Sequence, residues 1–264
     1  MNKDFFKVAF KLPFPSFRCP HCEPGFLQLV EKSMKIYEPT YSKINTQDPD
    51  AEFDWAVRRY NCIFECSYKA CSEIVCMSGL VEYLEEYEFD EQGYPCGERY
   101  VDVYKPLTFS PAPVLITIPK QAPETVKEAI ESAFTLYWID LEACTSRLRM
   151  SIELLLDELH VPRRSSKNKP LTLNQRIDEY AKLNPGSSLI NTLEVFRGIG
   201  NIATHEDSIE RKLVKEAFEI YEETLRELFD NKSAVINEMK NSIIKKLELR
   251  DRLAIQPDVK RVDD

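Results

Sequence analysis

The segment RGIGNIATHED, residues 197 to 207, places an arginine, an asparagine and a histidine at intervals of four residues. If this segment is helical, Arg197, Asn201 and His205 lie along one face, within about 80° of each other and over roughly 12 Å. A histidine can move a proton near neutral pH, and an arginine can stabilise the charge that gathers on a phosphorane. Together with Asn201, which would orient the imidazole or bind a phosphate oxygen, these residues are the candidate catalytic set of a metal-independent ribonuclease.

A structural role explains the same three residues. Arg197 would then pair with an acidic residue of a neighbouring helix, such as Glu153, while Asn201 and His205 cap or brace adjacent helices through hydrogen bonds. Arg147 and Glu153 form a polar insertion on an otherwise apolar helix face, and they would meet Arg197 and His205 across a helical bundle. A contact of Arg147 and Glu153 with Arg197 and His205 would fit both the catalytic and the structural interpretation.

A second group of residues has the spacing of a metal site. The motif CPHC places Cys19 and Cys22 in a tight turn, and CIFECSYKAC offers Cys66 and Cys71 as a second pair. Four thiolates suit tetrahedral zinc, and they would tie an amino-terminal hairpin to a strand about 45 residues later. We therefore predict a structural zinc ion bound by Cys19, Cys22, Cys66 and Cys71.

Other assignments of the cysteines stay open at this point. Cys62 or His21 would replace one of the four ligands, and the cysteines would alternatively be unliganded core residues, disulfides or ligands of another metal. Cys144 lies beside an apolar stripe and is interpreted as part of the core.

The elements that must position these residues change in character along the chain. Residues 1 to 118 are rich in cysteine, aromatic residues and proline, with short β-type runs such as KVAFKL, YNCIFEC and PVLITIP. The acidic stretch EYLEEYEFDEQ in this part would repel phosphate and favours contact with protein. We expect a small zinc-ribbon-like, β-containing domain here.

Residues 119 to 231 have helical periodicity throughout. Apolar residues at steps of three, four and seven predict one long helix over residues 124 to 159. Thr172 is placed to cap a helix that ends at Asn184-Pro185-Gly186, and two further helices follow. Short connections between them predict an all-α antiparallel bundle, followed by a C-terminal helix and tail over residues 232 to 264.

Three segments of this helical region resemble a known family. SRLRMSIELLLDEL, LTLNQRIDEY and LEVFRGIGNIATHED are similar, in order and spacing, to the family of domains of unknown function numbered 4145. The resemblance covers residues 124 to 230, and members of this family often carry a cysteine-pair zinc ribbon in front of the helices. It implies a bundle similar to the HEPN group, in which many domains are metal-independent RNases that act as dimers.

The resemblance supports two functions. Members are found with restriction and other antiphage systems, which implies a homodimer with RNA or a protein of a defence system as its partner. In the HEPN motif a polar residue follows the arginine, and the histidine comes after four to six positions. Here Gly198 follows Arg197, and seven residues lie between Arg197 and His205. A bundle that departs from the motif often survives as a non-catalytic dimerisation or partner-binding module.

Composition narrows the class of protein. With 264 residues, of which 43% are hydrophobic and 30% charged, the chain is expected to be a soluble α+β protein. The start has no pattern of a secretion signal and no run is long enough to cross a membrane, so we expect a cytoplasmic location. The net charge of −9 argues against extensive binding to duplex DNA but leaves room for a small phosphate site. The basic run RRSSKNK, residues 163 to 169, is interpreted as a solvated loop.

Overall fold

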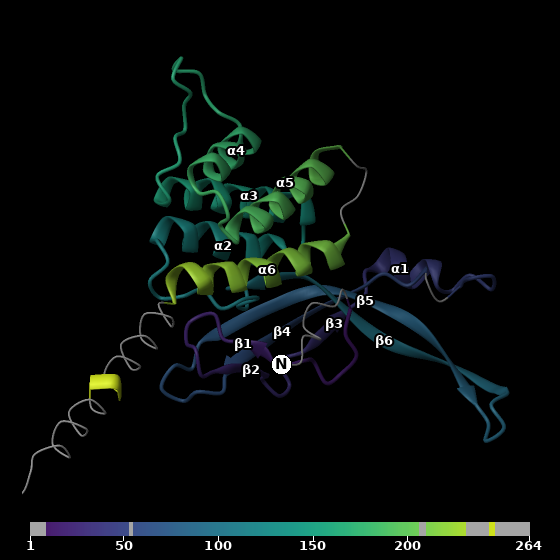
Figure 1. Cartoon of the computed structure of the whole chain (residues 1–264). Coiled ribbons are helices and arrows are strands. Elements are labelled where there is room, and N and C mark those ends of the chain that lie inside the picture. The colour runs from purple at the N-terminus through teal and green to yellow at the C-terminus, as the bar shows by residue number, and fades with distance from the viewer. Residues whose placement is uncertain (1–8, 53–54, 206–209, 231–242, 246–264) are drawn as a thin grey trace, which may run out of the picture.

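The computed structural model describes residues 9–52, 55–205, 210–230 and 243–245. The first part of the chain forms an antiparallel sheet, and the part after it forms a group of helices (Figure 1). The prediction of an α+β protein, with a β-containing part followed by a helical part, is confirmed. Most of the predicted C-terminal helix and tail lies outside the described residues, although residues 243–245 are helical.

The sheet contains six strands in which every pairing is antiparallel. The strands are β1 (Phe17–Arg18), β2 (Phe26–Leu29), β3 (Lys35–Tyr37), β4 (Arg58–Cys66), β5 (Ile74–Phe89) and β6 (Pro95–Ser110). Their order is β1-β2-β4-β5-β6, and β3 also pairs with β4. The short helix α1 (Thr40–Asn45) lies between β3 and β4 in the chain.

Strand β4 contains the predicted YNCIFEC run, and its residues alternate between the core and the surface. The side chains of Tyr60, Cys62, Phe64 and Cys66 are buried, whereas the residues between them are exposed. This alternation follows from the two-residue period of a strand with one covered face. In the described part of the other two predicted runs no regular strand forms: residues 9–12 of KVAFKL contribute one bridge, Phe10 to Tyr104, and PVLITIP contributes one bridge, Val114 to Arg18.

Five helices follow the sheet over residues 119–230, of which the structure describes all but 206–209. They are α2 (Glu124–Leu136), α3 (Leu141–Glu158), α4 (Leu173–Leu183), α5 (Leu189–His205) and α6 (Arg211–Phe229). Thr172 caps α4, as predicted, and its hydrogen bonds with Gln175 form a capping box; the last helical residue is Leu183, and Asn184 is the C-cap. The predicted boundary at residue 118 falls in the connection between β6 and α2.

The prediction of one long helix over residues 124 to 159 was wrong, because the chain turns between α2 and α3. Asp140 caps α3 by accepting a hydrogen bond from the backbone N–H of Ala143 at 2.8 Å. The carbonyl of Tyr137 instead accepts a hydrogen bond from Nη1 of Arg211 on α6 at 2.6 Å. A favourable cap and a partner for the freed carbonyl therefore replace a continuous helix at this point.

The sheet and the helices share one hydrophobic core. Trp138, between α2 and α3, packs its ring against Phe17 of β1 and Phe109 of β6, with centroids 6.0 and 4.5 Å apart. Tyr137 packs against Phe218 of α6. Tyr137 and Trp138, which are adjacent in the chain, thus connect the helices to the sheet. Within the described residues, no helix has the length and apolar character needed to cross a membrane.

Candidate metal centre

The first two cysteines lie in the turn between β1 and β2. The backbone N–H of Cys19 donates to the carbonyl of Gly25 at 3.0 Å, which closes the turn. The backbone N–H of His21 donates to Sγ of Cys19 at 3.4 Å. Hydrogen bonds from backbone N–H groups stabilise a thiolate, and the tight turn directs Cys19 and Cys22 toward the same point.

The second pair lies in a turn with the same pattern, between β4 and β5. The backbone N–H of Cys66 donates to the carbonyl of Glu73 at 2.9 Å, and the N–H of Tyr68 donates to Sγ of Cys66 at 3.4 Å. Cys71 is held by a backbone hydrogen bond to the carbonyl of Tyr68 at 2.8 Å. The two turns therefore present their thiols in equivalent ways.

Strand pairing brings the two turns together. In the register of β2 and β4, Leu27 lies opposite Cys66, so the turn before β2 and the turn after β4 meet at one end of the sheet. The four sulfur atoms of Cys19, Cys22, Cys66 and Cys71 all lie within 4.8 Å of one another. The prediction that these four cysteines form one group is confirmed.

The distances between the sulfur atoms suit a shared ion and exclude disulfides. Sγ of Cys19 lies 3.8 Å from Sγ of Cys71, and Sγ of Cys22 lies 3.5 Å from Sγ of Cys66. A disulfide requires about 2.05 Å. Four sulfurs at about 2.3 Å from a central tetrahedral ion would lie about 3.8 Å from each other. The residues present therefore fit a metal ion with four thiolate ligands.

Gly25 leaves the space that the thiols occupy. A Cβ atom at this position would lie 2.2 Å from Sγ of Cys66 and 2.7 Å from Sγ of Cys22. Any other residue type would therefore push the sulfur atoms out of the cluster. Sequence inspection missed this glycine, although its place three residues after Cys22 is a signal that could have identified it.

Burial and the neighbouring thiols shape the acidity of the cluster. Burial raises the pKa of Cys19 and raises the pKa of Cys22 to about 12. Burial also opposes ionisation of Cys66, but hydrogen bonds from the backbone of Tyr68 and from the other thiols lower its pKa. A bound cation would favour the deprotonated form of all four side chains.

The alternative ligands lie outside the cluster. Cys62 is buried within β4, and its burial raises the pKa of its thiol to about 12. The side chain of His21 is 71% exposed, and its Nδ1 lies 4.0 Å from Oε2 of Glu73. Cys144 is buried in the helical core, as predicted.

The second predicted site lies on α5. Residues 197 to 205 are helical, as the spacing argument required. The side chains of Asn201 and His205 lie outside the part of the chain that the structure describes. The side chain of Arg197 is described, and it is surrounded by oxygen atoms.

Arg197 connects α5 to α4. Its Nη2 donates to Oδ1 of Asp178 at 2.6 Å and to the carbonyl of Asn174 at 2.7 Å, and its Nη1 donates to both carboxylate oxygens of Glu194 at 3.0 Å. The Asp178 carboxylate, with a smaller contribution from Glu194, raises the pKa of Arg197. The carboxylates around Arg197 are thus not that of Glu153, which we had expected as its partner.

The predicted supporting residues have other contacts. The carboxylate of Glu153 lies 3.6 Å from Nε of Arg149, one turn earlier in α3. Arg147 is exposed, and its Nη1 lies 3.4 Å from the sulfur of Met150. Among the described contacts, neither residue meets Arg197.

Comparison with family models finds two matches. Residues 9–109 match the family described as Domain of unknown function (DUF8608), and residues 131–250 match the family described as Domain of unknown function (DUF4145). The second match confirms the family resemblance of the helical region. Neither the curated proteins nor the solved structures include a match to this chain.

Proposed function

Starting from a helical region that matches the DUF4145 family, we propose that this protein is a non-catalytic partner-binding module of a defence or nucleic-acid-processing complex. Its metal centre is structural and holds zinc. Four thiolates in tetrahedral spacing favour zinc, and four protein ligands leave no position open for a substrate. The connection with defence rests on the family resemblance.

The observation that carries this proposal is an exposed arm, defined as residues 82–102 at the joined ends of β5 and β6. The arm extends away from helices α2 to α6 (Figure 1). It exposes several large side chains, those of Tyr83, Leu84, Tyr87, Phe89, Tyr94 and Tyr100. Exposed aromatic groups in such number are typical of protein interfaces.

The register of the arm gathers three of its tyrosines, Tyr83, Tyr87 and Tyr100, on one face. Residues opposite each other in an antiparallel pair project to the same side of the sheet. The pairs are Tyr83 with Asp102, Glu85 with Tyr100, and Tyr87 with Glu98. This face therefore alternates aromatic and acidic side chains across both strands.

Charge identifies the kind of partner. The arm contains eight acidic residues and one arginine, Arg99, whose guanidinium pairs with Glu86 at 2.8 Å. Three cations outside the arm, Lys11, Arg58 and Lys105, pair with Glu86, Asp102 and Glu82, and the arm stays acidic after these pairs are counted. Such a surface repels nucleic acid and a second acidic arm, and it attracts a protein with a basic surface. We therefore assign the arm to a basic protein partner. A homodimer, if formed, would use the helical bundle instead.

A photo-crosslinking residue at Tyr87, introduced in the native host, tests this assignment. We expect it to capture a protein with a basic surface, and that protein, once purified, should bind the full chain. Combined Tyr87→Ala and Phe89→Ala substitutions should raise the Kd at least about tenfold. A matched control removes two exposed side chains of α1, Tyr41→Ala and Ile44→Ala, and should leave the Kd unchanged. Equal losses in both variants would contradict the assignment.

A metal-independent endoribonuclease is the alternative function. The helical conformation of residues 197 to 205 supports it, because Arg197, Asn201 and His205 then occupy positions i, i+4 and i+8 of one helix. The ion pairs of Arg197 oppose it, because a guanidinium that is already bound to Glu194 and Asp178 is not available to stabilise the phosphorane. Incubation with mixed RNA in chelator distinguishes the two. Cleavage that ends in cyclic phosphate and is lost in His205→Ala would support the nuclease and contradict the non-catalytic proposal.

A further inference from the structure

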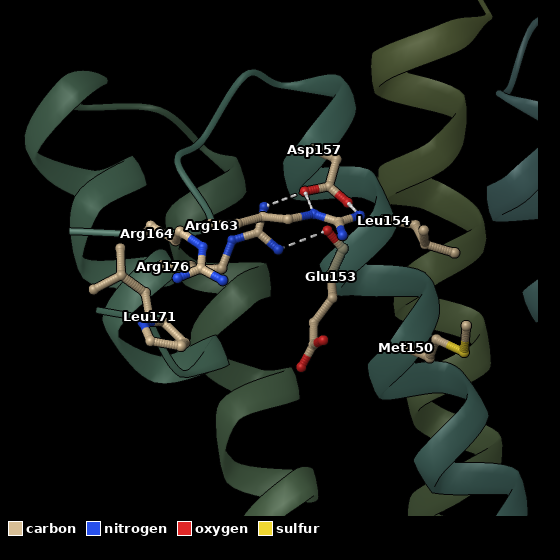
Figure 2. Close-up of a pocket in the computed structure, with 9 residues that line it drawn as sticks. Met150, Glu153, Leu154, Asp157, Arg163, Arg164, Leu171 and Arg176 are labelled. Carbon is tan, nitrogen blue, oxygen red and sulfur yellow. Dashed lines mark hydrogen bonds and ion pairs between the residues drawn. The ribbon is translucent and has the colours of Figure 1, made fainter. Parts of the chain in front are cut away.

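A pocket with a volume of about 460 Å³ opens between α3, α4 and the connection that joins them. Ligand pockets in proteins commonly have volumes of about 300–1,000 Å³. The pocket contains three arginines, Arg163, Arg164 and Arg176, two of which belong to the basic run that the sequence analysis interpreted as a solvated loop. Figure 2 shows their guanidinium groups in a row, with Leu171 at one end of the row and Asp157 and Leu154 at the other.

Arg176 is the buried member of this group, with 4% of its surface exposed. Its Nη1 donates to the carbonyl of Glu153 at 2.9 Å, and its Nη2 donates to Oδ1 of Asp157 at 2.7 Å and to the carbonyl of Val161 at 3.0 Å (Figure 2). Its Nε is buried and has no hydrogen-bond partner among the described residues. A buried N–H group without a partner is rare in folded proteins and points to an acceptor that binds there.

The other two arginines lie at the surface of the pocket. Arg163 forms a two-pronged ion pair with both oxygens of Asp157, so Asp157 connects Arg163 to Arg176. Arg164 is exposed, and its Nη1 donates to the carbonyl of Asn168, an uncharged partner. Three guanidinium groups face the two carboxylates of Asp157 and Glu153, which leaves a positive excess within a chain of net charge −9. A local positive excess of this kind attracts an anion.

Apolar residues line the pocket at two places. Met150 and Leu154 of α3 lie at the end where Asp157 holds Arg163, whereas Leu171, which follows Pro170 in the chain, lies at the other end, on the side of Arg164 (Figure 2). Aliphatic side chains such as those of Pro170 and Leu171 provide a contact surface for a ring. The pocket thus combines an anion-binding side with a surface for an apolar, planar group.

We propose that this pocket binds a mononucleotide, with the phosphate at Arg164 and Nε of Arg176 and the base against Pro170 and Leu171. The acidic net charge of the chain disfavours a long polyanion, whereas a single phosphate is matched by the local excess of one positive charge. This inference is independent of the proposed partner-binding function, because the pocket and the arm have no residue in common.

Isothermal titration of the full chain with AMP, GMP, CMP and UMP tests the proposal. We expect one-to-one binding of at least one mononucleotide. The corresponding nucleoside and inorganic phosphate should each bind at least about tenfold more weakly, because each supplies only half of the contacts. Arg164→Ala should weaken the binding of that mononucleotide at least about tenfold, because it removes the guanidinium that has no carboxylate partner among the described residues.

Lys167→Ala is the matched control, because it removes the same charge from an exposed residue of the same loop that does not line the pocket. It should change the Kd less than twofold, and a melting curve confirms that both variants are folded. No binding by any of the four mononucleotides, equally tight binding of inorganic phosphate or of the nucleoside, or equal effects of the two substitutions would each overturn the proposal.

Discussion

At the scale of single residues, the metal centre depends on a residue that bears no ligand atom. The four cysteines provide the sulfurs, but Gly25 provides the space in which they converge. Backbone N–H groups of His21 and Tyr68 then stabilise the thiolate form of the first cysteine in each turn. Ligands and their supporting contacts act together in such centres.

Substitution of Gly25 by alanine should therefore impair metal binding while all four ligands remain. The added Cβ would lie 2.2 Å from Sγ of Cys66, so the sulfur must shift. We expect the affinity for Zn²⁺ to fall at least about tenfold, as for other residues that support metal ligands. Competition with a chromogenic chelator measures this affinity.

Gly97→Ala provides the control for that experiment. An added Cβ at Gly97 would lie 3.5 Å from the carboxylate of Glu88, which is an ordinary contact. This variant should bind zinc like the unmodified chain. Equal affinity of Gly25→Ala and Gly97→Ala would contradict the role assigned to Gly25.

The spacing of the cysteines was sufficient to predict the ligands, because two short-range pairs leave few ways to build a tetrahedral site. The partners of Arg197 could not be predicted in the same way. Its contacts with Asp178 and Asn174 depend on how α4 lies against α5, and a single sequence does not record that packing. Glu153 has the charge expected of a partner for Arg197, but its carboxylate lies next to Arg149 instead.

At the scale of elements, the sequence pattern predicted the start of α4 correctly but did not reveal the break between α2 and α3. Thr172 predicted the start of α4 because a helix cap is a local signal, and the structure adds that Gln175 completes a capping box within four residues. The break between α2 and α3 was missed because the apolar stripe continues across it at helical spacing, and Asp140 was not recognised as a cap.

The long strands β5 and β6 were also missed, for a different physical reason. Residues Val75 to Val81 alternate between buried and exposed positions, but within the arm nearly every side chain is exposed. Without a covered face, the sequence shows no alternation of apolar and polar residues to reveal a strand. The same exposure makes the arm the candidate interface.

The ion pair between Arg197 and Asp178 should stabilise the contact between α5 and α4. The Arg197 side chain is 24% exposed and that of Asp178 is 54% exposed, so solvent weakens their attraction. A double-mutant cycle with Arg197→Met and Asp178→Asn, followed by urea denaturation, should give a coupling free energy of about 0.5–1 kcal/mol.

The pair formed by Lys182 and Glu179, both on α4, is the comparison for this cycle. Its side chains are 68% and 40% exposed, and it joins no other element. Its coupling should be smaller, because solvent screens both of its charges more fully. A coupling of Arg197 with Asp178 no larger than that of Lys182 with Glu179 would remove the structural explanation for Arg197 and strengthen the case for a catalytic role.

At the scale of the whole molecule, the four-cysteine cluster and the helices are connected through one core. Trp138 packs against Phe17, which lies in β1 two residues before Cys19. Phe17 also packs against Phe64 of β4, two residues before Cys66. Loss of the metal should therefore affect the helical layer as well as the sheet.

Removal of the metal by a chelator should lower one shared melting transition. The chain has two tryptophans, so a Trp55→Phe variant leaves buried Trp138 as the only fluorescent reporter of its kind. We expect the fluorescence of Trp138 and the helical circular dichroism signal to melt together, about 10 °C lower than with metal, since structural zinc contributes several kcal/mol. A helical signal that keeps its original melting temperature would show that the bundle is independent of the metal centre.

X-ray absorption spectroscopy at the zinc edge, on the purified full chain, tests the central claim most directly. The account predicts one zinc ion per chain with four sulfur neighbours at about 2.3 Å, and a loss of that signal in Cys66→Ser but not in Cys62→Ser. A nitrogen or oxygen ligand in the first shell, or a full complement of zinc in Cys66→Ser, would contradict it.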